Sequence, residues 1–353
     1  MRGVITVLGE IDADELGVVL PHEHLIADLG GQWEMPADDD ALRDALRRLS
    51  PELYARSQIQ PAHYRAVLGL HDPLAAVEEL EPFVEAGGGT VVDLTPAGLG
   101  RDPTALAAIS RLAGVHVVMG CGEYVARSHA GYVEVCSAEQ IRDVILAELE
   151  NGVGLTDIRP GIIGEIGSGN PLTDGERKVL RAAAMAQRQT GLALSIHRTV
   201  FPELYAALDA LDLVIAEGVD PARIVMCHCD ERPEPEFALQ VGERGAWIEL
   251  DTFGMEHWAA NWRHPSGPVR RSYDPDRIEI LLRVLDAGYL DRVLISQDVC
   301  MQTMLRRHGG GGYAHIDTDI VERLLDVGVS QDDIDQIRTA NPRRMLTGEE
   351  IAV

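Results

Sequence analysis

The chain has 353 residues, of which 46% are hydrophobic and 25% are charged, as is typical of a soluble globular protein. Its formal net charge of −26 repels nucleic-acid phosphates and anionic lipid surfaces, so neither is expected as a partner. No apolar run approaches the roughly 20 residues of a membrane-spanning helix.

Short β-branched runs alternate with helical segments along the chain. The first run, 16–20, leads into Pro21-His22-Glu23-His24-Leu25. Seven further runs follow at 90–94, 115–119, 161–165, 192–197, 223–228, 246–250 and 292–296. Eight strands that alternate with helices predict a parallel α/β fold, a (β/α)8 TIM barrel, and we expect residues 1–353 to form one such domain.

Three long segments interrupt the regular alternation. Residues of about 38–70 form an insertion after the first strand, with helical periodicity in 41–49. A long loop after the seventh strand contains Trp258, a candidate substrate-binding residue, and the loop after the eighth strand is rich in glycine. All three follow strands, so they are expected on the face where barrel enzymes hold their active sites.

The first strand ends in a histidine pair. Because side chains alternate along a strand, His22 and His24 share one face and Glu23 points away. Two imidazoles on one strand end can bind one divalent metal, although such a pair is weak evidence when it stands alone.

Further candidate ligands occupy the ends of other predicted strands. These residues are Glu165, His197, His228 and Asp298, at the fourth, fifth, sixth and eighth strands. Four imidazoles and two carboxylates on one rim predict a site for two divalent metal ions, most simply zinc, with manganese, cobalt or iron as alternatives.

The chain resembles the phosphotriesterase-related branch of the amidohydrolase superfamily over nearly its whole length. The resemblance lies in 21–25, 161–167, 171–173 with 176–180, 310–313 and 341–342. It implies a distorted barrel, a homodimer, and two divalent metals bridged by a hydroxide. His22, His24 and Asp298 would bind the more buried metal, and His197 and His228 the more exposed one.

The residue that bridges the two metals departs from the better-known members. Those members use a CO2-modified lysine, whereas the single lysine here, Lys178, lies on the predicted helix after the fourth strand. Glu165 is expected to form the bridge, as in the subgroup that this chain most resembles. It stands one position later than the lysine of its relatives, so a bulge at Gly164 is needed to point it inward.

By the same resemblance, the bridging hydroxide attacks a carbonyl or phosphoryl centre, and Asp298 is both ligand and general base. Thr252 stands where phosphotriesterases have a relay histidine. Tyr124 is similar to a tyrosine that leans over the site in lactonase relatives, which makes it a candidate substrate-binding residue, with packing at the rim as the alternative. A lactone or an N-acyl amide is the expected substrate. Phosphoester hydrolysis, including that of phosphotriesters, and a non-catalytic small-molecule-binding barrel are the alternatives.

The five cysteines are odd in number and scattered along the chain. This pattern argues against a disulfide framework and predicts a reducing, cytoplasmic environment.

Overall fold

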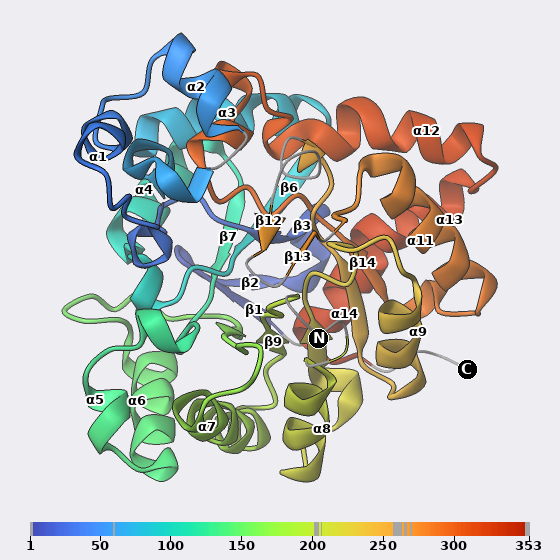
Figure 1. The fold of residues 1–353 in the computed structure, drawn as a ribbon. Coiled ribbons are helices and arrows are strands. Elements are labelled where there is room, and N and C mark those ends of the chain that lie inside the picture. The colour runs from blue at the N-terminus through green and yellow to red at the C-terminus, as the bar shows by residue number, and fades with distance from the viewer. Residues whose placement is uncertain are drawn as a thin grey trace.

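The computed structural model describes residues 3–58, 61–200, 205, 207–256, 263–264, 267–268 and 270–349. Eight parallel strands occupy its centre and helices surround them (Figure 1). The strands are β3 (Val18–Glu23), β6 (Gly88–Asp93), β7 (His116–Met119), β8 (Ile163–Ile166), β9 (Leu194–Ile196), β10 (Ile224–Met226), β11 (Trp247–Leu250) and β14 (Val293–Ile295).

Strand pairing follows the chain order around a barrel. One parallel sheet has the order β3-β6-β7 and the other the order β8-β9-β10-β11-β14. Backbone hydrogen bonds continue across both gaps: Gly161 N donates to Met119 O (2.9 Å), and Asp298 N donates to His22 O (3.2 Å). The protein therefore has the predicted (β/α)8 fold.

Helices cover the outside of the strands. They are α3 (Pro73–Glu85), α4 (Pro103–Ala113), α5 (Tyr132–Val135), α6 (Ala138–Asn151), α7 (Asp174–Thr190), α8 (Leu208–Ala216), α9 (Glu236–Glu243), α11 (Asp274–Asp286), α12 (Val321–Asp326), α13 (Gln331–Asp335) and α14 (Asn341–Thr347). The predicted start of α7 is confirmed, because Thr173 caps it in a capping box with Glu176. Gly191, in the left-handed conformation, ends this helix.

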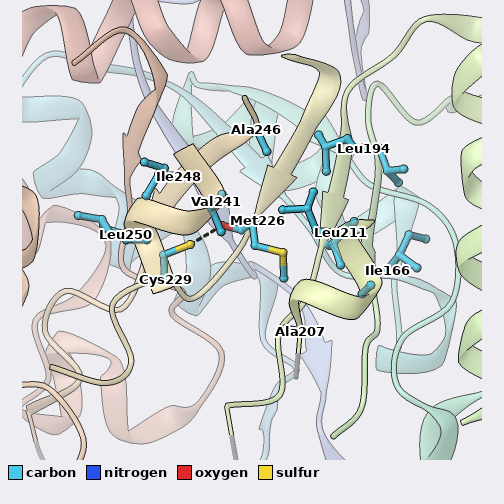
Figure 2. Packing of buried hydrophobic residues seen from close by; sticks show 14 of the residues in the cluster. Ile166, Leu194, Ala207, Leu211, Met226, Cys229, Val241, Ala246, Ile248 and Leu250 are labelled. Carbon is cyan, nitrogen blue, oxygen red and sulfur yellow. Dashed lines mark hydrogen bonds between the residues drawn. The ribbon is translucent and has the colours of Figure 1, made fainter. Parts of the chain in front are cut away.

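Side chains on the two faces of the strands belong to two different hydrophobic clusters. Outward-facing side chains such as Ile166, Leu194, Met226 and Ile248 pack against the helices in the largest cluster (Figure 2). Inward-facing residues of the strands form a second cluster, which includes Val19, Val92, Val118, Ile162, Val225 and Leu294. Met345 and Leu346 of α14 and Val4 of β1 belong to the same cluster. β1 (Gly3–Thr6) forms a hairpin with β2 (Gly9–Asp12). This apolar plug leaves the opposite end of the barrel for polar side chains.

The insertion after β3 is helical, as predicted. It contains α1 (Asp39–Ala45) and α2 (Pro51–Ser57), and its ends are joined where β4 (Ala27–Asp28) pairs with β5 (Gly69–Leu70). Leu29, Leu53 and Leu68 pack against Met255 and Met301, which follow β11 and β14. The insertion therefore covers the carboxyl end of the barrel. The loop after β11 includes the strands β12 (Arg263–His264) and β13 (Gly267–Pro268).

Candidate metal centre

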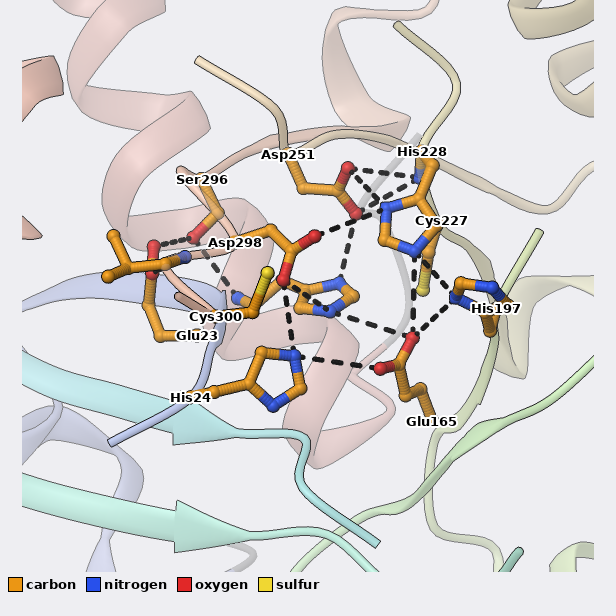
Figure 3. Close-up of polar contacts among 12 residues, drawn as sticks. Glu23, His24, Glu165, His197, Cys227, His228, Asp251, Ser296, Asp298 and Cys300 are labelled. Carbon is orange, nitrogen blue, oxygen red and sulfur yellow. Dashed lines mark hydrogen bonds and ion pairs between the residues drawn. The ribbon is translucent and has the colours of Figure 1, made fainter. Parts of the chain in front are cut away.

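The six predicted side chains meet at the carboxyl ends of the strands (Figure 3). Glu165 lies at the centre of the group. Its Oε2 is 3.0 Å from His197 Nδ1, 3.6 Å from His228 Nε2 and 3.7 Å from His22 Nε2. Its Oε1 is 3.6 Å from His24 Nε2, which also lies 3.1 Å from Asp298 Oδ1.

An irregularity in β8 points Glu165 into this group. The register of β8 against β9 shifts between Ile163 and Ile166. Gly164, within the shift, has a φ of +128°, and a Cβ there would lie 2.5 Å from Ser195 O. Only glycine fits this conformation and this close approach. The irregularity that the sequence requires at Gly164 is thus present.

The histidine protonation pattern suits metal binding. His22 Nδ1 is 2.9 Å from Asp251 Oδ2 and 3.0 Å from Glu249 Oε2, and His228 Nδ1 is 2.9 Å from Asp251 Oδ1. Because an ionised carboxylate only accepts hydrogen bonds, both rings donate from Nδ1, which leaves Nε2, on the side of Glu165, as the atom that a metal ion would bind. His22 Nε2 is buried without a hydrogen-bond partner among the described residues, as expected for an atom whose partner is a metal ion.

The donors fall into two overlapping sets. His22, His24 and Asp298 form one, and His22, Glu165 and His228 form the other. His197 lies beside the second set, with its Nδ1 2.8 Å from His228 Nε2. Imidazole and carboxylate donors fit zinc and similar divalent ions, so the residues present could hold such metals.

A layer of buried polar groups holds the histidines, and the sequence did not reveal it. Asp251 touches His22 and His228, and Thr95 Oγ1 lies 2.8 Å from His24 Nδ1. Burial favours the neutral form of Asp251, but the charges of His228 and His22 outweigh it and hold its pKa below the usual range. Burial raises the pKa of Glu249 to about 7 against the opposing effect of His22. Only the alternation of β11, which points both acids inward, could have indicated them.

Burial raises the pKa of Glu165 in isolation, but the adjacent imidazoles of His197, His228 and His22 lower it well below the usual range. Glu165 is therefore an ionised carboxylate, as a metal bridge requires.

A small cavity lies over the group. Its polar side consists of His24, Glu165, His228 and Asp298, and its other wall of Ala27, Leu29, Leu99, Tyr124 and Cys300. The Tyr124 hydroxyl is 3.1 Å from His197 Nε2, and burial raises the pKa of this phenol well above its usual value. Tyr124 thus presents a protonated hydroxyl at the cavity.

The sequence model of the phosphotriesterase family matches residues 2–346. The chain belongs to the phosphotriesterase family. An N-acetyltaurine hydrolase from Tetraodon nigroviridis is 36% identical over 346 residues, which cover 98% of this chain and 97% of the relative. The structure of a resiniferatoxin-binding protein from Rhodobacter sphaeroides, also 36% identical, superposes with a TM-score of 0.92 over 98% of this chain and 95% of that chain.

A mutant of a phosphotriesterase-like lactonase from Deinococcus radiodurans is more distant, at 25% identity and a TM-score of 0.75 over 97% of this chain and 99% of that chain. With these relatives and the buried His/Glu/Asp group, this phosphotriesterase-family protein is a metal-dependent hydrolase.

Thr252 follows Asp251 just after β11. Thr252 Oγ1 accepts a hydrogen bond from Arg277 Nε (2.9 Å), and its backbone N donates to Asp230. The hydroxyl is thus engaged where phosphotriesterases were expected to have a relay histidine. Trp258 lies outside the described residues.

Proposed function

We propose that this hydrolase cleaves the amide bond of a small N-acyl amine, of the kind that N-acetyltaurine represents, at a centre of two metals. The observation that carries the proposal is the ionised Glu165 carboxylate, whose Oε1 lies 3.6 Å from His24 Nε2 and whose Oε2 lies 3.0 Å from His197 Nδ1 and 3.6 Å from His228 Nε2. The N-acetyltaurine hydrolases that match this chain over nearly their full length support the amide as substrate.

In this proposal His22, His24 and Asp298 would hold one metal, His197 and His228 would hold the other, and Glu165 would contribute its carboxylate to both. Bound divalent ions supply Lewis acidity, which polarises a carbonyl and lowers the pKa of water. Asp298 Oδ1 faces the cluster 3.1 Å from His24 Nε2, where it can take a proton from the attacking water. We assign to Tyr124 the role of hydrogen-bond donor to the substrate carbonyl.

Thr252 favours an amide over a phosphotriester. Thr252 has no group that titrates near neutral pH, so it cannot replace a relay histidine. A lactone is the second candidate, because a phosphotriesterase-like lactonase shares the fold.

The metal-loaded enzyme should be assayed against N-acetyltaurine, other N-acetyl amines, lactones and phosphotriesters, with the released product measured by mass spectrometry. We expect the highest kcat/KM for an N-acetyl amine and its loss in Asp298→Asn. Preferential turnover of lactones or phosphotriesters would contradict the amide assignment. Binding without any turnover would instead favour the small-molecule-binding barrel.

We further propose that zinc is the resident metal, that the chain belongs to the subgroup in which Glu replaces the carboxylated lysine, and that it is a cytoplasmic homodimer. The single lysine, Lys178, lies on α7 and donates a surface hydrogen bond to Glu134 O. None of the helices in the described ranges has the length and apolar character to cross a membrane. Light scattering after gel filtration would test the dimer.

A further inference from the structure

Glu23 stands between the two metal-site histidines but faces the other way. Its side chain is fully buried and lies beside Ser296, away from Glu165 and His197 (Figure 3). Its Oε1 accepts hydrogen bonds from Ser296 Oγ (2.8 Å), Gln297 N (2.9 Å) and Gln297 Nε2 (3.1 Å). Its Oε2 accepts one from Val299 N (2.8 Å). One carboxylate therefore holds the segment that follows β14.

The two backbone donors flank Asp298. This aspartate has a φ of +49°, in the left-handed region that residues other than glycine rarely adopt. Such a conformation persists when the surrounding structure imposes it. Glu23 fixes the amides of Gln297 and Val299, and Asp298 N itself donates to His22 O (3.2 Å). Three consecutive amides are thus attached to one dipeptide of β3.

We propose that Glu23 is a positioning residue that fixes the Asp298 carboxylate at the metal centre by holding the backbone on both sides of it. The inference rests on the role of Asp298 in the proposed function. The His22-Glu23-His24 segment at the end of β3 thus supplies two imidazoles to the metal centre. Its central residue also sets the position of the Asp298 carboxylate, which follows β14.

Replacement of Glu23 by glutamine tests this role. The amide keeps the size of the side chain but presents one NH2 group, so at least one of the four donors faces a donor instead of an acceptor. Asp298 should then lose its fixed geometry. With Co²⁺ as the probe, we expect Glu23→Gln to alter the visible absorption spectrum of the bound metal and to weaken binding roughly 10- to 100-fold.

Glu79→Gln is a matched control. Glu79 is 4% exposed, and it also accepts backbone hydrogen bonds in the loop after β14, from Arg306 N (2.7 Å) and Arg307 N (3.0 Å). It has the same chemistry but does not flank Asp298. Glu79→Gln should lower thermal stability while leaving the Co²⁺ spectrum and affinity as in the wild type.

A Glu23→Gln protein with the wild-type Co²⁺ spectrum and affinity, and only a stability loss like that of Glu79→Gln, would overturn the proposal. If Glu23→Gln does not fold, Glu23→Asp keeps the charge but is too short to reach both amides, and an unchanged spectrum there would overturn it equally. Because these readouts need no substrate, they stand even if the enzyme proves to hydrolyse lactones.

Discussion

Asp251 couples two histidines that come from different strands. One of its oxygens lies 2.9 Å from His22 Nδ1 and the other 2.9 Å from His228 Nδ1. Its own backbone N donates to Asp230 Oδ1 (3.2 Å), and Asp230 Oδ2 lies 3.8 Å from Arg277 Nε. Asp251 therefore orients both imidazoles, with Glu249 as a second acceptor for His22, and we expect the two proposed metals to depend on Asp251 together.

Asp251→Asn should weaken the binding of both proposed metals. Asparagine offers one acceptor oxygen, so either His228 loses the acceptor of its Nδ1–H or His22 keeps Glu249 alone, and loss of such a partner costs roughly 10–100-fold in metal affinity. Isothermal titration with Zn²⁺ measures this effect. Asp317→Asn is the control, since the Asp317 side chain is 4% exposed and pairs with Arg338 away from the cluster. Equal Zn²⁺ affinity in Asp251→Asn and the wild type would contradict the coupling.

Lys178→Gln should change neither metal content nor kcat/KM. Lys178 is the single lysine of the chain, and it makes a hydrogen bond to Glu134 O (3.3 Å) on the helical layer. A substitution there removes no ligand if Glu165 is the bridge. Metal analysis by mass spectrometry, with and without added bicarbonate, provides the measurement. A bicarbonate-dependent rise in metal loading would refute the assignment of Glu165.

The sequence was sufficient to predict the candidate metal ligands at the strand ends. It was insufficient to predict the buried acids that hold those ligands. His22, Glu165 and Asp298 could be predicted because a strand end combined with a ligand-type side chain is a local pattern. The alternation of β11 could indicate that Asp251 and Glu249 point inward, but not that they contact His22, which is more than 220 residues away and is brought to them by the closed barrel. Glu23 was correctly predicted to point away from the two histidines. The groups in 296–299 that donate hydrogen bonds to its carboxylate could not be predicted.

At the scale of elements, the start of α7 is attached to the loop that carries Tyr124. Glu176 accepts from Thr173 N (2.8 Å) in the capping box and also from Ala126 N (2.9 Å), two residues beyond Tyr124. One buried carboxylate thus stabilises a helix end and positions a loop over the cavity.

Glu176→Ala should reduce both stability and substrate affinity. Loss of the acceptor removes the hydrogen bonds from Thr173 N and Ala126 N, at about 0.5–1.5 kcal/mol each, and frees the loop, so KM should rise more than kcat falls. Ser137→Ala, at the exposed N-cap of α6, should cost about 0.5–2 kcal/mol without any change in KM. Urea unfolding and steady-state kinetics compare the two variants. Equal KM values in the two variants would contradict the link between the start of α7 and substrate affinity.

The regular elements were predictable and the small connecting ones were not. All eight barrel strands coincide with β-branched runs in the sequence, and Thr173 and Glu176 marked the start of α7. The pair β4–β5, in contrast, has two residues per strand joined across the whole insertion. Segments this short have no periodicity to detect, so the way in which the insertion closes onto the barrel required the structure.

For the molecule as a whole, the carboxylates of Glu165, Asp251 and Asp298 lie in one buried group with several imidazoles at the carboxyl end of the barrel. Divalent cations that bind only the folded state would neutralise the group and stabilise the fold.

Removal of metal should therefore lower the Tm of the whole protein. A ligand present at 1,000 times its Kd contributes about 4 kcal/mol, which corresponds to a fall on the order of 5–10 °C for a domain of this size. Calorimetry of the Zn²⁺-loaded and chelator-treated protein measures the difference. Ionic strength must be held constant, because salt screens the surface charge and stabilises both forms. In Glu165→Gln the shift should shrink, since the proposed bridge is lost. Coincident melting curves for loaded and chelated wild type, with metal content verified, would show that no metal is bound at this centre.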